Sequence, residues 1–162
     1  MFRVNFYIKS SINGNSTLHY DPSAEWNIYI DPQAANILFE SGAPVTLVPL
    51  DACNHARVTV DFLQQLGHNH ATAEADFVYT ALEDIQGFIE SGNYYFWDPL
   101  AAAILKDGGL ATYERDPNCV IEEEGSQSGQ TVVQEGCPLL TVAVTADQAA
   151  PEQVLISTLN NP

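Results

Sequence analysis

The sequence predicts an α/β fold, in which the strands of one sheet alternate with helices. Residues 44–50 form a short, continuous apolar run that is typical of a strand buried on both faces. Apolar residues at helical spacing precede and follow this run, over 34–39 and 58–89. Beyond residue 119 the pattern changes to short β-branched segments separated by glycine and serine turns, which indicates further strands.

The N-terminal part is expected to be mostly extended. Residues 2–8 are apolar and aromatic enough for a strand, and the polar stretch 16–23 is typical of a loop. We expect 24–30 to be a second strand. Glu25 and Asn27 would then project from the same face, because alternate residues of a strand do so. A carboxylate beside an amide can bind the adjacent hydroxyls of a polyol such as ribose.

A capped helix is expected next. Asp31 and Pro32 have the residue types of an N-cap and a first helical position, and apolar residues over 34–39 give the helix a buried face until Gly42 ends it. The apolar strand that follows ends at Asp51. Open α/β sheets usually bind their ligands at the C-terminal ends of strands, so Asp51 has the position of a ligand-binding residue.

Helices are predicted for the middle of the chain and strands for its tail. Apolar spacing predicts helices over 58–66 and 71–89, and a third that begins at Asp98 and Pro99 and ends at two glycines. Taken alone, these two residues are an N-cap and a first-turn proline. The tail is expected to contain strands at 120–121, 131–133 and 139–144, and a closing helix at 151–159.

Composition restricts the partners of the chain. Its 162 residues and 46% hydrophobic content suffice for one domain with a sizeable core. The formal charge of -16 repels nucleic acid and anionic lipid, but is compatible with a neutral nucleoside and attracts divalent cations. The alternative is that this acidity is a solvated surface with no direct role. No apolar run approaches membrane-spanning length and no signal peptide is evident, so the cytoplasm is the default compartment.

Several reactive side chains are assigned no catalytic role. The three cysteines, Cys53, Cys119 and Cys137, form no CxxC pair, so reduced thiols are expected and no zinc ribbon or disulfide framework is indicated. Four histidines lack a third metal ligand nearby and are expected at turns and on the surface. They are His19, His55, His68 and His70. The serines of 125–129 lack the strand and helix of a nucleophile elbow, and the acidic run 122–124 is expected to be solvated.

A series of short motifs runs in order from Gly14 toward the C-terminus. They are Gly14-Asn15, Ala24-Glu25-Trp26-Asn27, Asp31-Pro32, the strand before Asp51, Phe96-Trp97-Asp98-Pro99-Leu100-Ala101, the segment 125–133, and Val142-Ala143-Val144. Together they resemble the inosine-uridine nucleoside hydrolase family, whose members cleave the N-glycosidic bond of ribonucleosides. The resemblance implies an open, Rossmann-like α/β sheet with helices on both faces, and a homo-oligomer.

One part of the family pattern is absent from this sequence. The family begins with a strand and an Asp-Thr-Asp-x-x-x-Asp-Asp type loop, which supplies most calcium ligands and the catalytic base. The 162 residues contain no such segment, and residues 8–13 differ from the Met-Gly-Gly expected before Gly14. The chain therefore resembles the C-terminal half of a nucleoside hydrolase with the N-terminal strands missing, and we expect little or no activity from it as it stands.

The resemblance implies roles in sugar binding for four residues. Asn15, Glu25 and Asn27 fall on positions that hold ribose hydroxyls, and Trp26 falls on an aromatic position beside the sugar. Glu25 and Asn27 match without a gap, whereas Asn15 requires a few extra residues in the following loop. The alternative for Glu25 and Asn27 is a pair of solvent-facing strand residues.

Two further residues match positions near the reacting bond. Asp98 matches a family aspartate that binds calcium, although a hard cation needs several oxygen ligands. Trp97 stands where other members place a histidine that protonates the leaving base. An indole cannot do this, but it can stack on a purine, which favours purine nucleosides. The alternative is that Trp97 packs with Tyr94, Tyr95 and Phe96 as an apolar ledge.

Three functional hypotheses follow. The first is hydrolysis of ribonucleosides, purine-leaning, to base and ribose. The second is a non-catalytic product, either a truncated chain or a ribose-binding or assembly module, which would self-associate because half a sheet leaves an open edge. The third is a glycosidase that uses Glu25 and Asp98 as its two carboxylates, which requires both groups at one cleft.

Overall fold

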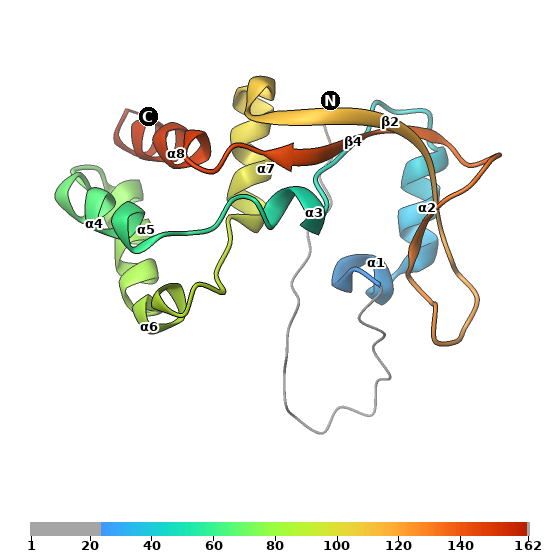
Figure 1. Cartoon of the computed structure of the whole chain (residues 1–162), viewed down its shortest axis with the longest axis horizontal. Helices are drawn as coiled ribbons and strands as arrows, with labels where there is room; N and C mark the ends of the chain where they lie inside the picture. The colour runs from blue at the N-terminus through green and yellow to red at the C-terminus, as the bar shows by residue number, and fades with distance from the viewer. Residues whose placement is uncertain (1–23, 162) are drawn as a thin grey trace. The chain divides into compact units, whose positions relative to one another are not determined.

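The computed structural model describes residues 24–161, which form two compact units. The sheet unit comprises 24–50 and 113–144, and the helical unit comprises 51–112 and 145–161. The chain passes between the units three times, at the start of α3 (Leu50–Cys53) and within the strands β2 (Ala111–Val120) and β4 (Leu139–Ala146), which Figure 1 labels. The predicted strand at 2–8, the residues Asn15 and His19, and the loop before Ala24 lie outside the described residues.

Within residues 24–161 the sheet has four strands in the order β1-β4-β2-β3, so the mixed α/β fold is confirmed. The two outer strands, β1 (Thr46–Leu47) and β3 (Thr131–Val133), are both short. β1 pairs with β4 in parallel, with Thr46 opposite Thr141. β2 pairs with β3 in antiparallel fashion, with Cys119 opposite Val132. The predicted strands at 131–133 and 139–144 are thus present, while β2 is far longer than the two residues predicted. The strand predicted at 44–50 is present only as Thr46–Leu47, and Asp51 lies in the helix α3 (Leu50–Cys53), so its predicted place at the C-terminal end of a strand is wrong.

Two helices pack against this sheet, α1 (Trp26–Ile30) and α2 (Pro32–Glu40). The shared core consists of Ile28, Phe39, Val45, Leu47, Val120 and Leu140. The prediction for the start of α2 is confirmed, because Asp31 Oδ1 accepts a hydrogen bond from Ala34 N at 2.9 Å and Pro32 is the first helical residue. Gly42, with φ of 69°, follows the end of the helix as expected.

The predicted strand at 24–30 is wrong, since these residues form the helix α1. Glu25 is its N-cap, and its Oε2 accepts a hydrogen bond from Ile28 N at 2.8 Å. A strand would place Ile28 and Ile30 on the same face, but Ile28 is 4% exposed and Ile30 is 59% exposed. The local cap and the burial of Ile28 therefore override the alternating pattern of the sequence.

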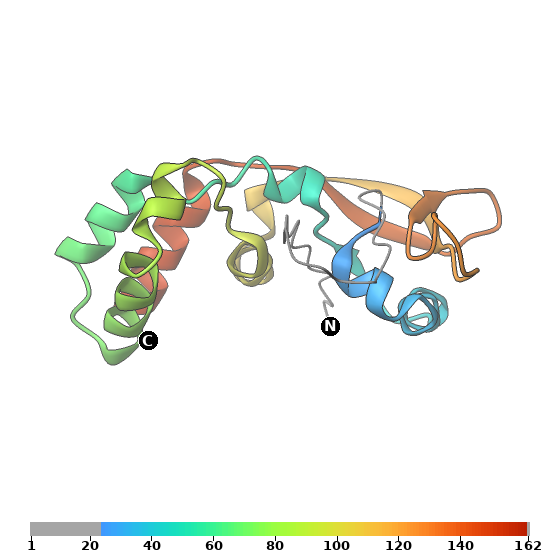
Figure 2. The same cartoon turned by 90° about the horizontal axis from the view of Figure 1, so that it is seen from below.

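The helical unit is built from short helices. They are α3 (Leu50–Cys53), α4 (Val60–His68), α5 (Ala73–Glu83), α6 (Gln86–Glu90), α7 (Trp97–Lys106), the 3-10 helix η1 (Gly108–Leu110) and α8 (Ala150–Asn160). The C-terminal helix α8 packs on α5 and α7, and Figure 2 shows it alongside the green helices. Phe62 and Phe96 meet edge to face in the core, with ring centroids 4.9 Å apart.

Two predictions in this unit are corrected. The helix predicted at 71–89 is two helices, because the chain turns at Asp84 and Ile85 between α5 and α6. Asp98 is not an N-cap either, because α7 already begins at Trp97 and Asp98 lies in its first turn. The start of α7 is set by Phe96, which is 3% exposed and whose ring contacts the core. Helix α4 and helix α8 are confirmed within two residues at each end.

The expectation of three reduced thiols is wrong. Cys119 and Cys137 form a disulfide with their Cα atoms 5.4 Å apart. The pair is 18 residues apart in sequence, and the β2–β3 pairing followed by the turn at Gly136 brings the two together. Cys53 remains a free thiol and is buried. The odd number of cysteines therefore gave no indication of this pair, which the fold of β2 and β3 brings together.

Candidate functional site

The three described residues with a predicted sugar-binding role lie at the start of α1 in the sheet unit. Glu25 and Asn27 do not share a strand face as predicted, because Glu25 is the extended N-cap residue and Asn27 already lies in the first turn of the helix. Asn27 is exposed, whereas Glu25 and Trp26 are half-buried. The Trp26 ring lies 6.2 Å from the ring of Tyr29, one turn along.

The carboxylate of Glu25 has a structural role at this position. Its Oε2 accepts a hydrogen bond from Ile28 N and so caps α1. The N-terminal end of a helix also favours a negative group at this position. A carboxylate is in addition an acceptor-only group of the kind that binds hydroxyl donors.

Trp97 lies in an aromatic group of the helical unit. Its half-buried ring contacts Tyr94 edge to face, with centroids 5.2 Å apart at 87°, and Tyr95 at 6.0 Å. Tyr94 in turn contacts Phe88 at 5.6 Å. The fourth member of the predicted ledge, Phe96, points into the core instead. The indole is thus held by two tyrosines.

The segment before α7 is anchored by a short strand-like pairing. Arg57 and Tyr95 form an isolated antiparallel bridge. Val58 N donates to Tyr94 O at 2.9 Å, and Phe96 N donates to Ala56 O at 2.8 Å. The Arg57 guanidinium also lies over the Tyr95 ring, 5.5 Å from its centroid. These contacts fix the approach of the backbone to Trp97.

Asp98 has an exposed side chain at the first turn of α7, near a buried thiol. Partial desolvation raises the pKa of Asp98 above its usual range. Burial, and then the negative charge of Asp98, raise the pKa of Cys53 to about 12, so this thiol is not a nucleophile. Burial and Asp98 also raise the pKa of Tyr94. The charge of Asp98 thus acts on both Cys53 and Tyr94.

A calcium site is not complete within the described residues. Calcium takes six to eight oxygen ligands, several of them usually carboxylates. Among residues 24–161 no group of three or more His, Cys, Asp or Glu side chains converges. Asp98 is one exposed carboxylate next to a protonated thiol, and this donor set does not fit a hard dication by itself.

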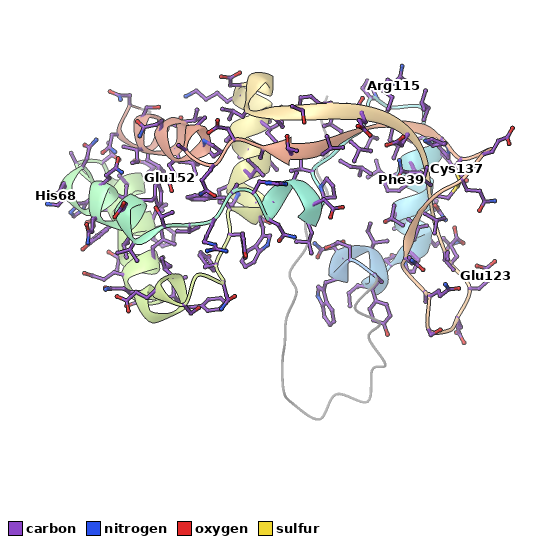
Figure 3. All side chains as sticks on the ribbon, in the orientation of Figure 1. Phe39, His68, Arg115, Glu123, Cys137 and Glu152 are labelled. Carbon is purple, nitrogen blue, oxygen red and sulfur yellow. A yellow bond between two sulfur atoms is a disulfide. The ribbon has the colours of Figure 1, made fainter. Side chains whose placement is uncertain are left out.

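The side chains to which the sequence assigned no catalytic role lie mostly as expected. His68 Nδ1 is 2.7 Å from Gln64 O, and His70 Nδ1 is 2.9 Å from Asp76 Oδ1, both at the surface. His55 is exposed as well. Ser126 is exposed in the loop between β2 and β3, not at a strand-to-helix elbow. Glu123, labelled in Figure 3, lies in the same loop and is exposed.

Two surface hollows are lined by other residues. The larger, about 630 Å³, lies in the sheet unit and includes Phe39, Arg115 and Cys137, which Figure 3 labels. The smaller, about 250 Å³, lies between α4 and α5 and includes His68 and Tyr79. No predicted site residue lines either hollow.

Sequence reasoning missed two residues that support α1 and α2. The Asn36 amide forms a two-way pair with the backbone of Val120, which lies 84 positions away in sequence. Gly129 lies against the backbone of Tyr29. No local pattern signals the Asn36 contact, because its partner is so distant. For Gly129 the sequence Gly-Ser-Gln-Ser-Gly indicates a turn, but it does not indicate that this turn lies against the backbone of Tyr29.

The described site residues divide between the two units. Glu25, Trp26 and Asn27 belong to the sheet unit, and Trp97 and Asp98 belong to the helical unit. Asn15 lies outside the described residues. No helix in the part of the chain that the structure describes is long and apolar enough to cross a membrane.

Comparison with known proteins shows one family whose model covers the site residues of both units. Residues 7–153 match the family model described as "Inosine-uridine preferring nucleoside hydrolase". "Nucleoside hydrolase 3" of Arabidopsis thaliana is 37% identical over 91 residues, 52% of this chain and 10% of that protein. "Pyrimidine-specific ribonucleoside hydrolase RihA" of Escherichia coli is 34% identical over 124 residues, 71% of this chain and 38% of that protein.

Solved structures show the same fold. A nucleoside hydrolase of Bacillus anthracis superposes with a TM-score of 0.77 at 22% identity, over 98% of this chain and 50% of that one. A purine-preferring ribonucleoside hydrolase of Gardnerella vaginalis gives a TM-score of 0.66 at 29% identity, over 85% of this chain and 47% of that one. The chain thus spans about half or less of the length of the relatives that it matches.

Proposed function

Because the chain belongs to the inosine-uridine preferring nucleoside hydrolase family, we propose that it acts in hydrolysis of the N-glycosidic bond of ribonucleosides, which releases base and ribose. The observation that carries this proposal is the extent of the family match. Residues 7–153 include both Glu25-Trp26-Asn27 and Trp97-Asp98, the two sets with separate chemical roles.

The reaction defines what each set does. The bond from the sugar carbon to the base nitrogen breaks, the nitrogen keeps the electron pair and is protonated, and a water oxygen bonds to the sugar carbon as it loses a proton. The transition state resembles an oxocarbenium ion, so hydrogen bonds to the neighbouring hydroxyls contribute to the rate. Glu25 and Asn27 supply acceptors and donors for these hydroxyls. Trp97 stacks on the leaving base.

We propose a preference for purine nucleosides on the basis of Trp97. A purine has the larger aromatic face, and the indole is held by Tyr94 and Tyr95 at a half-exposed position. The names of the relatives differ on this point, since the E. coli protein is pyrimidine-specific and that of G. vaginalis is purine-preferring. We therefore base the proposed purine preference on Trp97 and not on the names of the relatives.

Calcium enters the proposal only through Asp98. The family resemblance gives this residue one calcium contact, and the described residues do not complete the site. In the family pattern the remaining ligands and the water-activating carboxylate lie in an aspartate-rich loop that the 162 residues do not contain. We therefore propose that the 162-residue chain has little activity alone, and that it forms homo-oligomers or associates with a complementary segment.

A fusion experiment tests the function. The chain is assayed for release of base from inosine, alone and joined behind the N-terminal half of the E. coli relative. We expect background rates from the chain alone and clear hydrolysis from the fusion. Asp98→Ala in the fusion should remove hydrolysis, whereas Asp84→Ala, another exposed aspartate of the helical unit, should not. Full turnover by the Asp98→Ala fusion contradicts the role of Asp98.

A non-catalytic role is the alternative, and the incomplete metal site among the described residues favours it. In that case the chain binds ribonucleosides or ribose without cleaving them. The distinguishing result is a folded fusion that binds inosine, as measured by calorimetry, and releases no hypoxanthine.

The compartment is a separate question. The cytoplasm is the default from the sequence, but a disulfide such as Cys119–Cys137 persists mainly in oxidising compartments. Alkylation of free thiols in cells, completed under denaturing conditions, distinguishes the two compartments. All three cysteines should be alkylated if the compartment is reducing, whereas the two cysteines of the disulfide should be protected if it is oxidising.

A further inference from the structure

The loop between β2 and β3, residues 121–130, folds back onto α1. Gly129 N donates to Ile121 O at 2.8 Å, which closes the loop. Gly129 has a φ of 80°, and a Cβ at this position would lie 2.5 Å from Tyr29 Cα and 2.9 Å from Tyr29 N. Real Cβ atoms essentially never approach so closely. Only glycine allows this backbone contact between the loop and α1.

The same loop is fixed at its base by α2. Asn36 Nδ2 donates to Val120 O at 2.7 Å, and Asn36 Oδ1 accepts from Val120 N at 2.8 Å. The amide thus pairs with the end of β2 as a neighbouring strand would. Asn36 Nδ2 also donates to Glu122 Oε1 at 2.7 Å, at the first residues of the loop. The loop therefore contacts two consecutive helices.

Helix α1 needs this support. It has five residues, and so short a helix has no stability of its own in water. Its orientation is set by what it packs against: Ile28 in the core, α2, and the loop at Tyr29. Trp26 lies against the same Tyr29 ring. A shift at Tyr29 is therefore transmitted within one turn to the residues proposed to bind the sugar.

We propose that Gly129 and Asn36 are positioning residues for sugar recognition, which act through the loop 121–130 on α1. Asn36 holds the loop, and Gly129 lets it seat on Tyr29 at the distance that orients Glu25 and Asn27 toward the ribose hydroxyls. This inference rests on the proposed sugar-binding role of α1. It assigns to the loop the discrimination between ribonucleosides and 2'-deoxyribonucleosides.

Binding of inosine and 2'-deoxyinosine to the whole 162-residue chain, measured by titration calorimetry, tests the proposal. Wild-type protein should favour inosine. Gly129→Ala should weaken inosine binding about tenfold, the equivalent of one hydrogen bond to a charged group, and should weaken the binding of 2'-deoxyinosine, which has one hydroxyl fewer, by a clearly smaller factor. A merely structural role would lower both affinities together. Asn36→Asp, which loses the two donated bonds and faces Glu122, should act in the same direction and is the second variant.

Gly136→Ala is the matched control. Gly136 also has a positive φ, 95°, and lies in the same unit, but a Cβ there meets nothing within 4 Å. It imposes similar backbone strain without a collision. The proposal is overturned if folded Gly129→Ala and Asn36→Asp proteins keep the wild-type preference, or if Gly136→Ala loses it equally. If the wild-type protein itself binds both nucleosides equally, the proposed sugar-binding role of α1 also fails. The wild-type titration alone reveals this result, so it is distinguished from a failure of the positioning role.

Discussion

The hydroxyl of Thr59 joins two helices of the helical unit by donating a hydrogen bond to Glu152 Oε1 at 2.9 Å. The Thr59 hydroxyl oxygen also accepts from Phe62 N at 2.9 Å and so caps α4. Glu152 lies in the first turn of α8 and is only 8% exposed. A carboxylate is rarely buried so deeply without a cation. Here the hydrogen-bond donor is a neutral hydroxyl, and a second acid, Asp61, lies nearby.

Substitution of Glu152 by glutamine is predicted to stabilise the chain at neutral pH. Burial raises the pKa of Glu152, Asp61 raises it further, and the Thr59 bond only partly opposes them. The folded state therefore holds the proton to higher pH than the unfolded state, whose glutamate pKa is about 4.3. Stability falls as pH rises through this window and stays lower above it. The amide of the Glu152→Gln variant keeps an oxygen that accepts from Thr59 and carries no charge.

Urea unfolding at several pH values measures this effect. The advantage of Glu152→Gln should be present at pH 7 and should vanish below about pH 4, where both states of the wild type are protonated. Glu74→Gln, an exposed glutamate in the first turn of α5, is the control and should show no such gain. An equal difference between wild type and Glu152→Gln at every pH would show that charge burial is not the cause.

The Cys119–Cys137 disulfide is predicted to stabilise the sheet unit by about 3 kcal/mol, as expected for a closed loop of this length. The double variant Cys119→Ser and Cys137→Ser should lower the free energy of unfolding by that amount. Reductant should destabilise the wild type to a similar level and leave the double variant unchanged. The measurement is urea unfolding with and without dithiothreitol. A wild type that is insensitive to reductant would contradict the prediction.

The base preference is predicted to depend on Trp97. In the fusion described above, Trp97→Ala should lower kcat/KM for inosine more than for uridine, since the larger purine loses more stacking area. One base–aromatic stack corresponds to about 1–3 kcal/mol, or roughly five- to a hundredfold. Trp97→Phe should lie between the two, because it keeps an aromatic face. Equal losses for both substrates would mean that Trp97 only packs against Tyr94 and Tyr95.

The sequence predicted the parts of the fold in which a local pattern and its tertiary role agree. The Asp31-Pro32 start of α2 is confirmed because a cap and a first-turn proline act within one turn. The strand predicted before Asp51 is confirmed only in its buried middle, Thr46–Leu47, where the apolar run is continuous. The family is confirmed because several motifs in order identify it without any geometry.

The failures have two physical origins, a local helix cap that outweighs an alternating pattern and contacts between distant residues. The alternation of 24–30 predicted a strand, but the capping bond of Glu25 and burial of Ile28 produce a helix. The disulfide and the Asn36–Val120 pair depend on how β2 folds back, which no local window contains. Whether Glu25 and Asn27 bind a sugar was argued from a shared strand face that does not exist. Their role stays a prediction that rests on the family resemblance.

Glu25 itself allows the capping role and the sugar-binding role to be separated. Glu25→Ala removes the acceptor for Ile28 N and should lower the free energy of unfolding by about 1 kcal/mol. Glu25→Gln keeps an oxygen that accepts this bond, so its stability should stay near that of the wild type, while the loss of charge weakens hydrogen bonds from ribose hydroxyls. Urea unfolding and inosine titration on both variants provide the two measurements. A Glu25→Gln protein with wild-type inosine affinity would leave Glu25 as a helix cap alone.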